Sequence, residues 1–276
     1  VPNPVGSAPG FWLSSRGATV VSLPGVPTEM TAMMRESVAP LLASQLEDRR
    51  QRPAPIRRQV FHTWGLPEAD VDAKLQGLIA RNAPVDLGLL ASPLGVLVSL
   101  TSKPHKGAAG DRLAALSDAV RERLHEWIFA EGTDSMEAVI GRLLIEAKRT
   151  VALAESSTGG LIGHRLTQVP GSSAYVDRGV ISYSNQAKIE LLGVPADLIE
   201  RNGAVSAEVA AAMAKGIRER SGASIGVSVT GIAGPGGATA TKPVGLVYVA
   251  LNADNGDAAV REHRFHGHRS VIKQRS

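Results

Sequence analysis

The stretch that most constrains the fold of this chain is VALAESSTGGLIG, residues 151–163. A short apolar run that favours a β-strand is followed by one acid, three hydroxyl side chains and two glycines. The apolar spacing of a helix comes next, so the segment predicts a strand, a tight polar turn and a helix start. Such a turn lies at the carboxyl end of a sheet strand, where free backbone N–H groups favour an anion. Ser156 and Ser157 are expected at its mouth.

Composition narrows the class of protein. The 276 residues are 43% hydrophobic, which allows a sizeable core in two or more domains. The absence of cysteine excludes disulfides, thiolate chemistry and cysteine-based zinc sites, and it fits a reducing compartment. No apolar run approaches the ~20 residues of a membrane span, and no signal peptide is visible. We therefore expect a cytoplasmic protein with no membrane partner.

The chain opens on Val1 without a helix or strand signal, and we interpret it as a piece of a longer protein.

A local excess of arginine accounts for much of the net charge of +4. Five arginines and two prolines crowd a ten-residue stretch: Arg49, Arg50, Arg52, Pro53, Pro55, Arg57 and Arg58. The stretch has two interpretations, a nucleic-acid contact or a solvated, proline-stiffened linker. We favour the linker, so a nucleic-acid partner is not expected.

The pattern of elements predicts three segments, 1–52, 53–133 and 134–276. The first reads as the end of a domain, with a short buried strand at 18–23 and a helix that places Met30, Met33, Met34, Val38 and Leu41 on one face. The second reads as a small α+β domain of strand, helix, strand, strand and a long helix that reaches Ile128. Its helix pair lacks a Gly-x-x-Gly clamp, which argues against RNA binding in the KH manner.

The third segment alternates helices and strands and is predicted to be an α/β layered domain with parallel strands where helices intervene. Asp134 and Glu137 have the spacing of a helix capping box. Strands are expected at 150–154, 179–183, 223–230, 244–251 and 260–266. Polar loops follow two of these strands, at 155–160 and 230–237. If the two strands are neighbours, the loops converge on one cleft.

A serine at this turn needs a base to take its proton, and no histidine is near Ser156 in sequence. Lys188 lies in the first turn of a helix predicted from about Gln186, where the helix dipole disfavours a cation. Partial burial would lower its pKa further, towards a neutral amine. Tyr183 could relay the proton, and Ser173 could add a hydroxyl. The competing interpretation is an ordinary surface lysine, and spacing alone does not reject it.

The histidines offer a different chemistry. His263, His266 and His268 cluster near the end of the chain, and a His-x-His pair on a strand can bind a metal. Gly267 indicates that the strand is already ending, and Glu262 is the acid beside them. We favour solvated histidines at a sheet edge, so no metal is expected.

Six motifs occur in order over roughly a hundred residues: AESSTGG at 154–160, GSS at 171–173, YSNQAK at 183–188, GAVS at 203–206, GIAGP at 231–235 and KPVG at 242–245. Together they resemble the C-terminal domain of the competence/damage-inducible protein A (CinA) family, the nicotinamide mononucleotide deamidases. Residues 53–133 resemble the KH-like middle domain of that family, and residues 1–52 resemble the end of its molybdopterin-binding-like domain.

The resemblance implies hydrolysis of nicotinamide mononucleotide to nicotinate mononucleotide and ammonia, in pyridine nucleotide salvage, without cofactor or metal. It implies Ser156 as nucleophile, activated by Lys188 and Tyr183. It also implies substrate or oxyanion contacts from Thr158, Gly159, Gly160, Ser173, Thr230 and Gly231, and a phosphate or ribose contact from Arg269. A homodimer or larger assembly is expected on the same ground.

Two departures from the family pattern bear on these roles. Ser157 stands where the family often has cysteine, so a thiol there is not essential to the chemistry. His268 stands where the family commonly has an acid, beside Arg269. Two alternatives remain open: a nucleotide-binding module in which Lys188 stays charged, and a metal-dependent ADP-ribose pyrophosphatase that would need the missing N-terminal domain.

Overall fold

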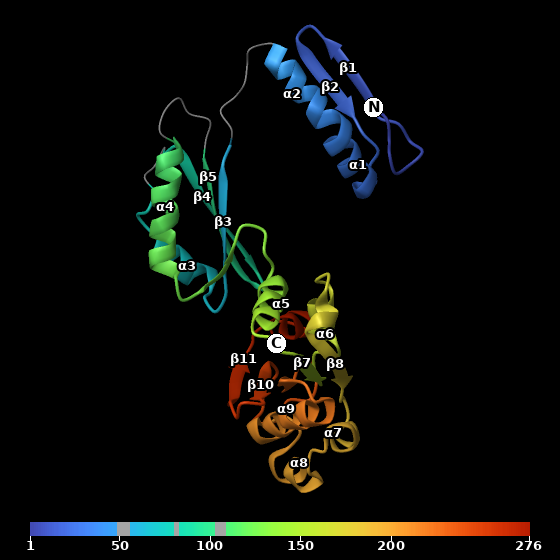
Figure 1. Ribbon diagram of the computed structural model, residues 1–276. Helices are drawn as coiled ribbons and strands as arrows, with labels where there is room; N and C mark the ends of the chain where they lie inside the picture. Colours follow the sequence, from blue (N-terminus) through green and yellow to red (C-terminus); the bar gives the residue numbers. More distant parts are fainter. Residues whose placement is uncertain (49–55, 80–82, 103–108) are drawn as a thin grey trace. The chain divides into compact units, whose positions relative to one another are not determined.

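The computed structural model describes residues 1–48, 56–79, 83–102 and 109–276. They form two compact units, one within Val1–Ile56 and one made of Arg57–Lys103 and Ala108–Ser276 (Figure 1). The second unit holds two separate sheets with helices, which confirms the mixed α/β class. Arg49, Arg50 and Arg52 of the basic stretch lie outside the described residues. Among the helices that are described, none has the length and apolarity to span a membrane.

The first unit is a hairpin with a helical segment. Its elements are β1 (Phe11–Ser15), β2 (Ala18–Ser22), α1 (Pro27–Met33), η1 (Met34–Val38) and α2 (Ala39–Asp48). The expectation of a buried strand at 18–23 is wrong, because β2 belongs to a two-stranded sheet with β1 and Val20 is 59% exposed. Of the predicted helix face, Met33 and Val38 are buried, whereas Met30, Met34 and Leu41 are exposed. A two-stranded sheet is too small to cover the whole face.

The second unit begins with an antiparallel sheet in the order β4-β5-β3-β6. Its elements are β3 (Arg58–Thr63), α3 (Glu68–Leu75), β4 (Val85–Ser92), β5 (Gly95–Ser102), α4 (Ala109–Leu124) and β6 (Ile128–Glu131). Phe61, Val98 and Val120 are at the centre of its core. The helix predicted to reach Ile128 ends at Leu124, because the next residues pair with β3 as a fourth strand. Sheet pairing overrides the helical spacing there.

The chain after β6 contains a five-stranded sheet in the order β11-β10-β9-β7-β8. The strands are β7 (Val151–Glu155), β8 (Val176–Ile181), β9 (Ile225–Gly231), β10 (Leu246–Ala253) and β11 (Ala258–Arg264). Strand β7 runs parallel to both of its neighbours, β8 and β9, and every residue of β7 is buried. The carboxyl ends of these three strands therefore lie at one edge of the sheet. Because β7 and β9 are neighbours, the condition set for the meeting of the two loops that follow them is fulfilled.

Helices cover both faces of this sheet. They are α5 (Met136–Glu146), α6 (Leu161–Thr167), η2 (Ser172–Ala174), α7 (Asn185–Leu192), α8 (Ala196–Asn202), α9 (Ala207–Ser221) and α10 (Arg269–Arg275). Ala152 and Ala154 pack in the cluster that contains Met213 of α9, whereas Leu153 packs with Leu166 of α6. Successive residues of a strand point to opposite faces, so α9 and α6 lie on opposite sides of β7.

Three details differ from the sequence prediction. Ser135, not Asp134, caps α5, since its hydroxyl accepts from the backbone N–H of Ala138, and Asp134 instead pairs with Arg142. Strand β8 starts and ends earlier than the predicted 179–183, because its pairing with β7 sets its register. Helix α8 was not predicted, since its seven residues show too short a periodic pattern.

Tight contact between β9 and α9 gives a testable prediction. A Cβ on Gly226 would lie 2.1 Å from the carbonyl oxygen of Ala214, whereas one on Gly179 of β8 would meet nothing closer than 3.9 Å. We predict that Gly226→Ala lowers the free energy of unfolding by about 1–3 kcal/mol and Gly179→Ala does not. Urea unfolding of both variants checks this, and equal midpoints would contradict the packing described.

Candidate active site

The turn after β7 places Ser156 at the carboxyl edge of the sheet. The backbone N–H of Ser156 donates to the carbonyl of Val229 at 3.0 Å, which continues the β7–β9 pairing by one residue. The chain then reverses, with the N–H of Gly159 donating to the carbonyl of Ser156 at 3.1 Å. Gly159 and Gly160 have φ of 64° and 93°, a left-handed conformation that other residues rarely adopt. The turn is thus fixed by strand pairing at one end and by glycine at the other.

Glu155 organises the inside of this turn. Its carboxylate is 2% exposed and accepts three backbone N–H groups, from Gly160 at 2.9 Å, Ile162 at 3.1 Å and Gly163 at 2.8 Å. The prediction that the helix start offers free N–H groups to an anion is therefore wrong at these three positions. An internal carboxylate already occupies them. The sequence signal was present, since an acid precedes the helix start by a few residues, but its role was missed.

The backbone N–H groups that Glu155 does not bind include two in the turn itself. In the described part of the chain, neither Ser157 nor Thr158 donates its backbone N–H to another group. Both side chains are buried, and neither hydroxyl has a partner among the residues described. Buried polar groups are normally paired, so these donors are free for a ligand or water. They lie in sequence directly after Ser156.

Lys188 reaches this turn from α7. Ser184 caps the helix by accepting from the N–H of Ala187 at 3.0 Å, and Gly193 ends it in a left-handed conformation. The Lys188 side chain is 1% exposed, which overturns the surface-lysine interpretation. Its Nζ donates to the carbonyl of Ser182 at 2.8 Å and to Ser156 Oγ at 3.1 Å.

Burial controls the charge of this amine. Removal from water lowers the pKa of Lys188, because desolvation disfavours the ammonium form. Over residues 1–48, 56–79, 83–102 and 109–276, no carboxylate forms an ion pair with it. A neutral amine can keep N–H bonds to the carbonyls of Ser182 and, at 3.4 Å, Tyr183, and turn its lone pair to the Ser156 hydroxyl. The environment therefore favours a base beside a serine.

Tyr183 is placed differently from the prediction. Its backbone carbonyl contacts Lys188, but its phenol is 60% exposed, and the hydroxyl accepts from Arg269 Nη2 at 3.0 Å. A proton relay from the phenol to Lys188 is thus not made in this geometry. Arg269 Nη1 also donates to the carbonyl of Gly234 at 2.8 Å. Arg269 therefore links the segment after β8 to the loop after β9.

The other predicted site residues divide into two groups. Thr158, Gly159, Gly160, Thr230 and Gly231 lie at the carboxyl ends of β7 and β9, as expected from their adjacency. The Thr230 hydroxyl is already engaged, since it donates to the carbonyl of Ala204 at 2.8 Å. Ser173 lies in η2, which precedes β8, and so stands at the opposite edge of the sheet. Within the chain, Ser173 and Ser156 therefore lie at opposite ends of the parallel strands.

The histidine cluster lies on and after the edge strand β11. His263 stacks on Phe265 with ring centroids 5.2 Å apart, and burial lowers its pKa. Within the described ranges, no group of three histidine, cysteine or acidic side chains is arranged to hold a metal. His268 instead contacts Ser270 through Nδ1 at 2.8 Å.

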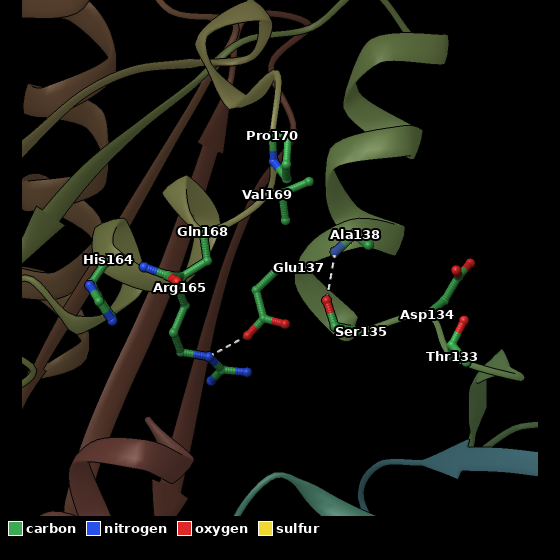
Figure 2. A pocket seen from close by; sticks show the side chains of 10 residues that line it. All are labelled: Thr133, Asp134, Ser135, Glu137, Ala138, His164, Arg165, Gln168, Val169 and Pro170. Atoms are coloured by element: carbon green, nitrogen blue, oxygen red, sulfur yellow. Dashed lines mark hydrogen bonds and ion pairs between the residues drawn. The ribbon is translucent and has the colours of Figure 1, made fainter. Parts of the chain in front are cut away.

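A hollow in this domain lies apart from these residues, between the start of α5 and the second half of α6 (Figure 2). It measures about 490 Å³, and Glu137 and Arg165 meet across it in an ion pair of 2.5 Å. Burial alone would raise the pKa of Glu137, but hydrogen bonds from its own backbone and from Arg165 outweigh it and lower the pKa. Arg165 is therefore neutralised by Glu137, and its charge is not offered to a ligand.

Comparison with known proteins gives consistent matches. Residues 133–276 match the family model described as the CinA C-terminal domain, and residues 58–130 match the damage-inducible protein CinA KH domain. CinA-like proteins of Geotalea uraniireducens and Geobacter sulfurreducens are 43% and 44% identical over 99% of this chain. The chain spans 64% and 65% of their lengths. The crystal structure of the competence/damage inducible protein CihA from Agrobacterium tumefaciens is 45% identical, with a TM-score of 0.49 over 50% of this chain and 84% of that one.

The role of Glu155 can be tested by two substitutions. Glu155→Ala leaves three partly buried N–H groups unpaired, so we predict a loss of about 1–3 kcal/mol in the free energy of unfolding. Glu155→Gln keeps the shape and one acceptor oxygen and should lose less. Chemical denaturation ranks the variants, and an alanine variant as stable as the parent would contradict this role.

Proposed function

This chain belongs to the CinA family, and we propose that residues 134–276 are an amidohydrolase that converts nicotinamide mononucleotide to nicotinate mononucleotide and ammonia. The choice of substrate follows from the family resemblance of the six motifs. The proposed chemistry rests on one observation, the contact of 3.1 Å between the buried Lys188 Nζ and Ser156 Oγ. A serine needs such a base to become a nucleophile.

In the proposed reaction, the neutral amine of Lys188 takes the hydroxyl proton of Ser156, and Oγ attacks the carboxamide carbon. The tetrahedral intermediate collapses when its C–N bond breaks. The proton held by Lys188 goes to the departing nitrogen, which leaves as ammonia. A water molecule then gives its proton to Lys188 and attacks the acyl-serine ester. Release of the nicotinate carboxylate returns the proton to Ser156 Oγ.

We propose the backbone N–H groups of Ser157 and Thr158, which find no acceptor among the described residues, as donors to the oxyanion of the intermediate. They follow the nucleophile directly, and Glu155 fixes the turn that carries them. Their backbone is held before the substrate arrives, so little reorganisation is needed when charge develops. Removal of one such donor typically costs ~10²–10³ in kcat.

We assign Tyr183 a positioning role rather than a proton relay. Arg269 donates to the Tyr183 phenol, and the Tyr183 carbonyl helps to orient Lys188. Thr230 holds the segment at Ala204 through its hydroxyl, and Gly231 after it ends β9 where the second loop begins. The competing function is a nucleotide-binding module, in which Lys188 keeps its proton and Ser156 forms no ester.

The direct test is ammonia release from nicotinamide mononucleotide in the presence of EDTA. We predict that Ser156→Ala and Lys188→Met each lower kcat by about 10²–10⁴-fold, since either removes the activated nucleophile. The matched control is Lys215→Met, which removes a lysine from the exposed face of α9. Release that survives Ser156→Ala contradicts the mechanism, and a folded parent that binds the nucleotide without releasing ammonia favours the binding module.

A pH profile tests the state of Lys188 separately. Because burial lowers its pKa, we predict that kcat/KM rises with pH to a plateau whose midpoint lies below the ordinary lysine value of 10.5. Between the lowered pKa and 10.5, the unfolded chain holds a proton that the folded chain lacks. The free energy of unfolding should therefore increase with pH across this window. Lys188→Met should lose that increase, and an unchanged pH dependence in this variant would contradict the assignment.

A further inference from the structure

Ser182 is the first residue after β8, and its hydroxyl is buried without a partner. The residue is 0% exposed, and its Oγ finds no hydrogen-bond partner among the described residues. Its backbone is engaged at both polar groups. The N–H donates to the carbonyl of Glu155 at 2.8 Å, which continues the pairing of β8 with β7 by one residue, and the carbonyl accepts from Lys188 Nζ. Buried polar groups are normally paired, because an unpaired one costs free energy.

The alternation of side chains places this hydroxyl on the face of the sheet that carries Lys188. Ile181 points to the α6 face, because its Cδ1 lies 3.2 Å from the position that a Cβ on Gly160, just before α6, would occupy. Val180 packs in the cluster of α7 and α9 on the other face. Successive side chains point to opposite faces, so Ser182 follows Val180 to the α7 face. The Ser182 hydroxyl therefore lies on the side from which the amine approaches.

Protonation changes the number of acceptors that Lys188 needs. An ammonium group has three N–H donors, and a neutral amine has two. The carbonyls of Ser182 and Tyr183 lie 2.8 and 3.4 Å from Nζ, and Ser156 Oγ lies 3.1 Å from it. In the proposed reaction, Ser156 Oγ becomes bonded to the substrate carbon while Lys188 holds the proton. The ammonium group then has two acceptors for three donors until the proton moves on.

The acids nearest to Lys188 in sequence and in the sheet do not supply the missing acceptor. Glu155 directs its carboxylate to N–H groups at the start of α6, on the opposite face. Glu190 of α7 accepts from the side chain of Gln186 instead. Burial without a counter-charge is the cause of the lowered pKa of Lys188. A neutral acceptor is therefore what its ammonium form requires.

The charged groups of the neighbouring helices are also directed elsewhere. On α9, Glu208 is exposed, and four further side chains have partners outside the site: Lys215 with Glu219, Arg218 with Asn252, and Arg220 with the carbonyl of Glu190. On α10, Arg269 donates to the Tyr183 hydroxyl. Lys273 Nζ lies 3.7 Å from the position that a Cβ on Gly159 would occupy. Both α10 groups are cations and cannot accept a proton from an ammonium group.

We propose that the Ser182 hydroxyl is the third acceptor of protonated Lys188, which makes Ser182 a positioning residue of the base. A serine side chain has three staggered rotamers, so rotation about its Cα–Cβ bond moves Oγ and leaves the backbone in place. The carbonyl of the same residue already holds the amine. The hydroxyl then accepts the third N–H while Ser156 Oγ is bonded to the substrate. The inference rests on the proposed function for the proton transfer, and it deepens that function by naming what steadies the proton.

The experiment follows the Lys188 Cε signal by NMR through a pH titration of the full chain and its variants. An acceptor for the ammonium group favours the charged form, so Ser182→Ala should lower the pKa of Lys188 by roughly one to two units relative to the parent. Ser182→Thr keeps a hydroxyl and should retain the parent value. Ser228→Ala is the matched control, because it removes a buried serine hydroxyl that donates to the carbonyl of Ala210 instead. It should leave the pKa unchanged.

A second measurement distinguishes this role from a structural one. Ser182→Ala removes a group that is unpaired in the structure, so urea unfolding should find this variant at least as stable as the parent. Ser228→Ala removes a hydrogen bond and should be less stable. A Ser182→Ala variant that unfolds or loses as much stability as Ser228→Ala overturns the inference, because the hydroxyl would then support the fold.

Ammonia release separates this inference from the proposed function. In an active parent, Ser182→Ala should move the midpoint of the kcat/KM profile to lower pH by the same shift that NMR gives. A parent that releases no ammonia, but whose Lys188 pKa falls in Ser182→Ala, supports the hydroxyl contact and contradicts the amidase. A Lys188 pKa that is unchanged or raised in Ser182→Ala overturns the inference, whether or not the parent is active.

Discussion

The contact between the Lys188 amine and the Ser156 hydroxyl requires a lysine to be buried at the edge of a sheet. An ammonium group loses much of its hydration there, and across the described residues no acid compensates it. The domain instead offers carbonyl groups from Ser182 and Tyr183, which are good acceptors for an amine but provide no counter-charge. Burial of a charged lysine in this environment costs free energy, whereas a neutral amine that can act as a base fits it. The fold around it is arranged to make the burial possible.

That arrangement depends on the place of β7 between two parallel neighbours. Its carboxyl end meets those of β8 and β9, so three loops that are distant in sequence come together. Glu155, the last residue of β7, uses its carboxylate to fix the turn that follows. Helix α10 then covers the same edge and adds its cations to the loops. The Ser156 hydroxyl, the Lys188 amine and the cations of α10 are thereby supplied by separate elements of the domain.

The sequence indicated the strand–turn–helix of residues 151–163 because its apolar pattern and its glycines agree with each other. It also indicated a helix from about Gln186, and the structure has α7 beginning at Asn185. The burial of Lys188 could not be derived, because it follows from the pairing of β8 with β7 and not from local spacing. Neither could the separation of Ser173 from the site, which depends on strand direction.

The local sequence pattern gave wrong predictions where tertiary contacts determined the structure. Ile128 fitted a helical stripe but pairs with β3. Glu155 was assigned to a polar loop, although it ends β7 and its carboxylate accepts N–H groups at the start of α6. Lys273 carries no sequence motif, and its position beside Gly159 emerges only when α10 is packed on Val229 and Val247. Long-range packing therefore decided most of what the sequence left open.

The most direct test of the central mechanism is a titration of the Lys188 amine itself, followed by NMR of its Cε carbon in the folded chain. The neutral-base mechanism predicts a pKa for Lys188 below the ordinary value of 10.5, because burial disfavours its charged form. Ser156→Ala should titrate in the same direction, since desolvation is the cause. A Lys188 amine that titrates at or above 10.5 would contradict the mechanism.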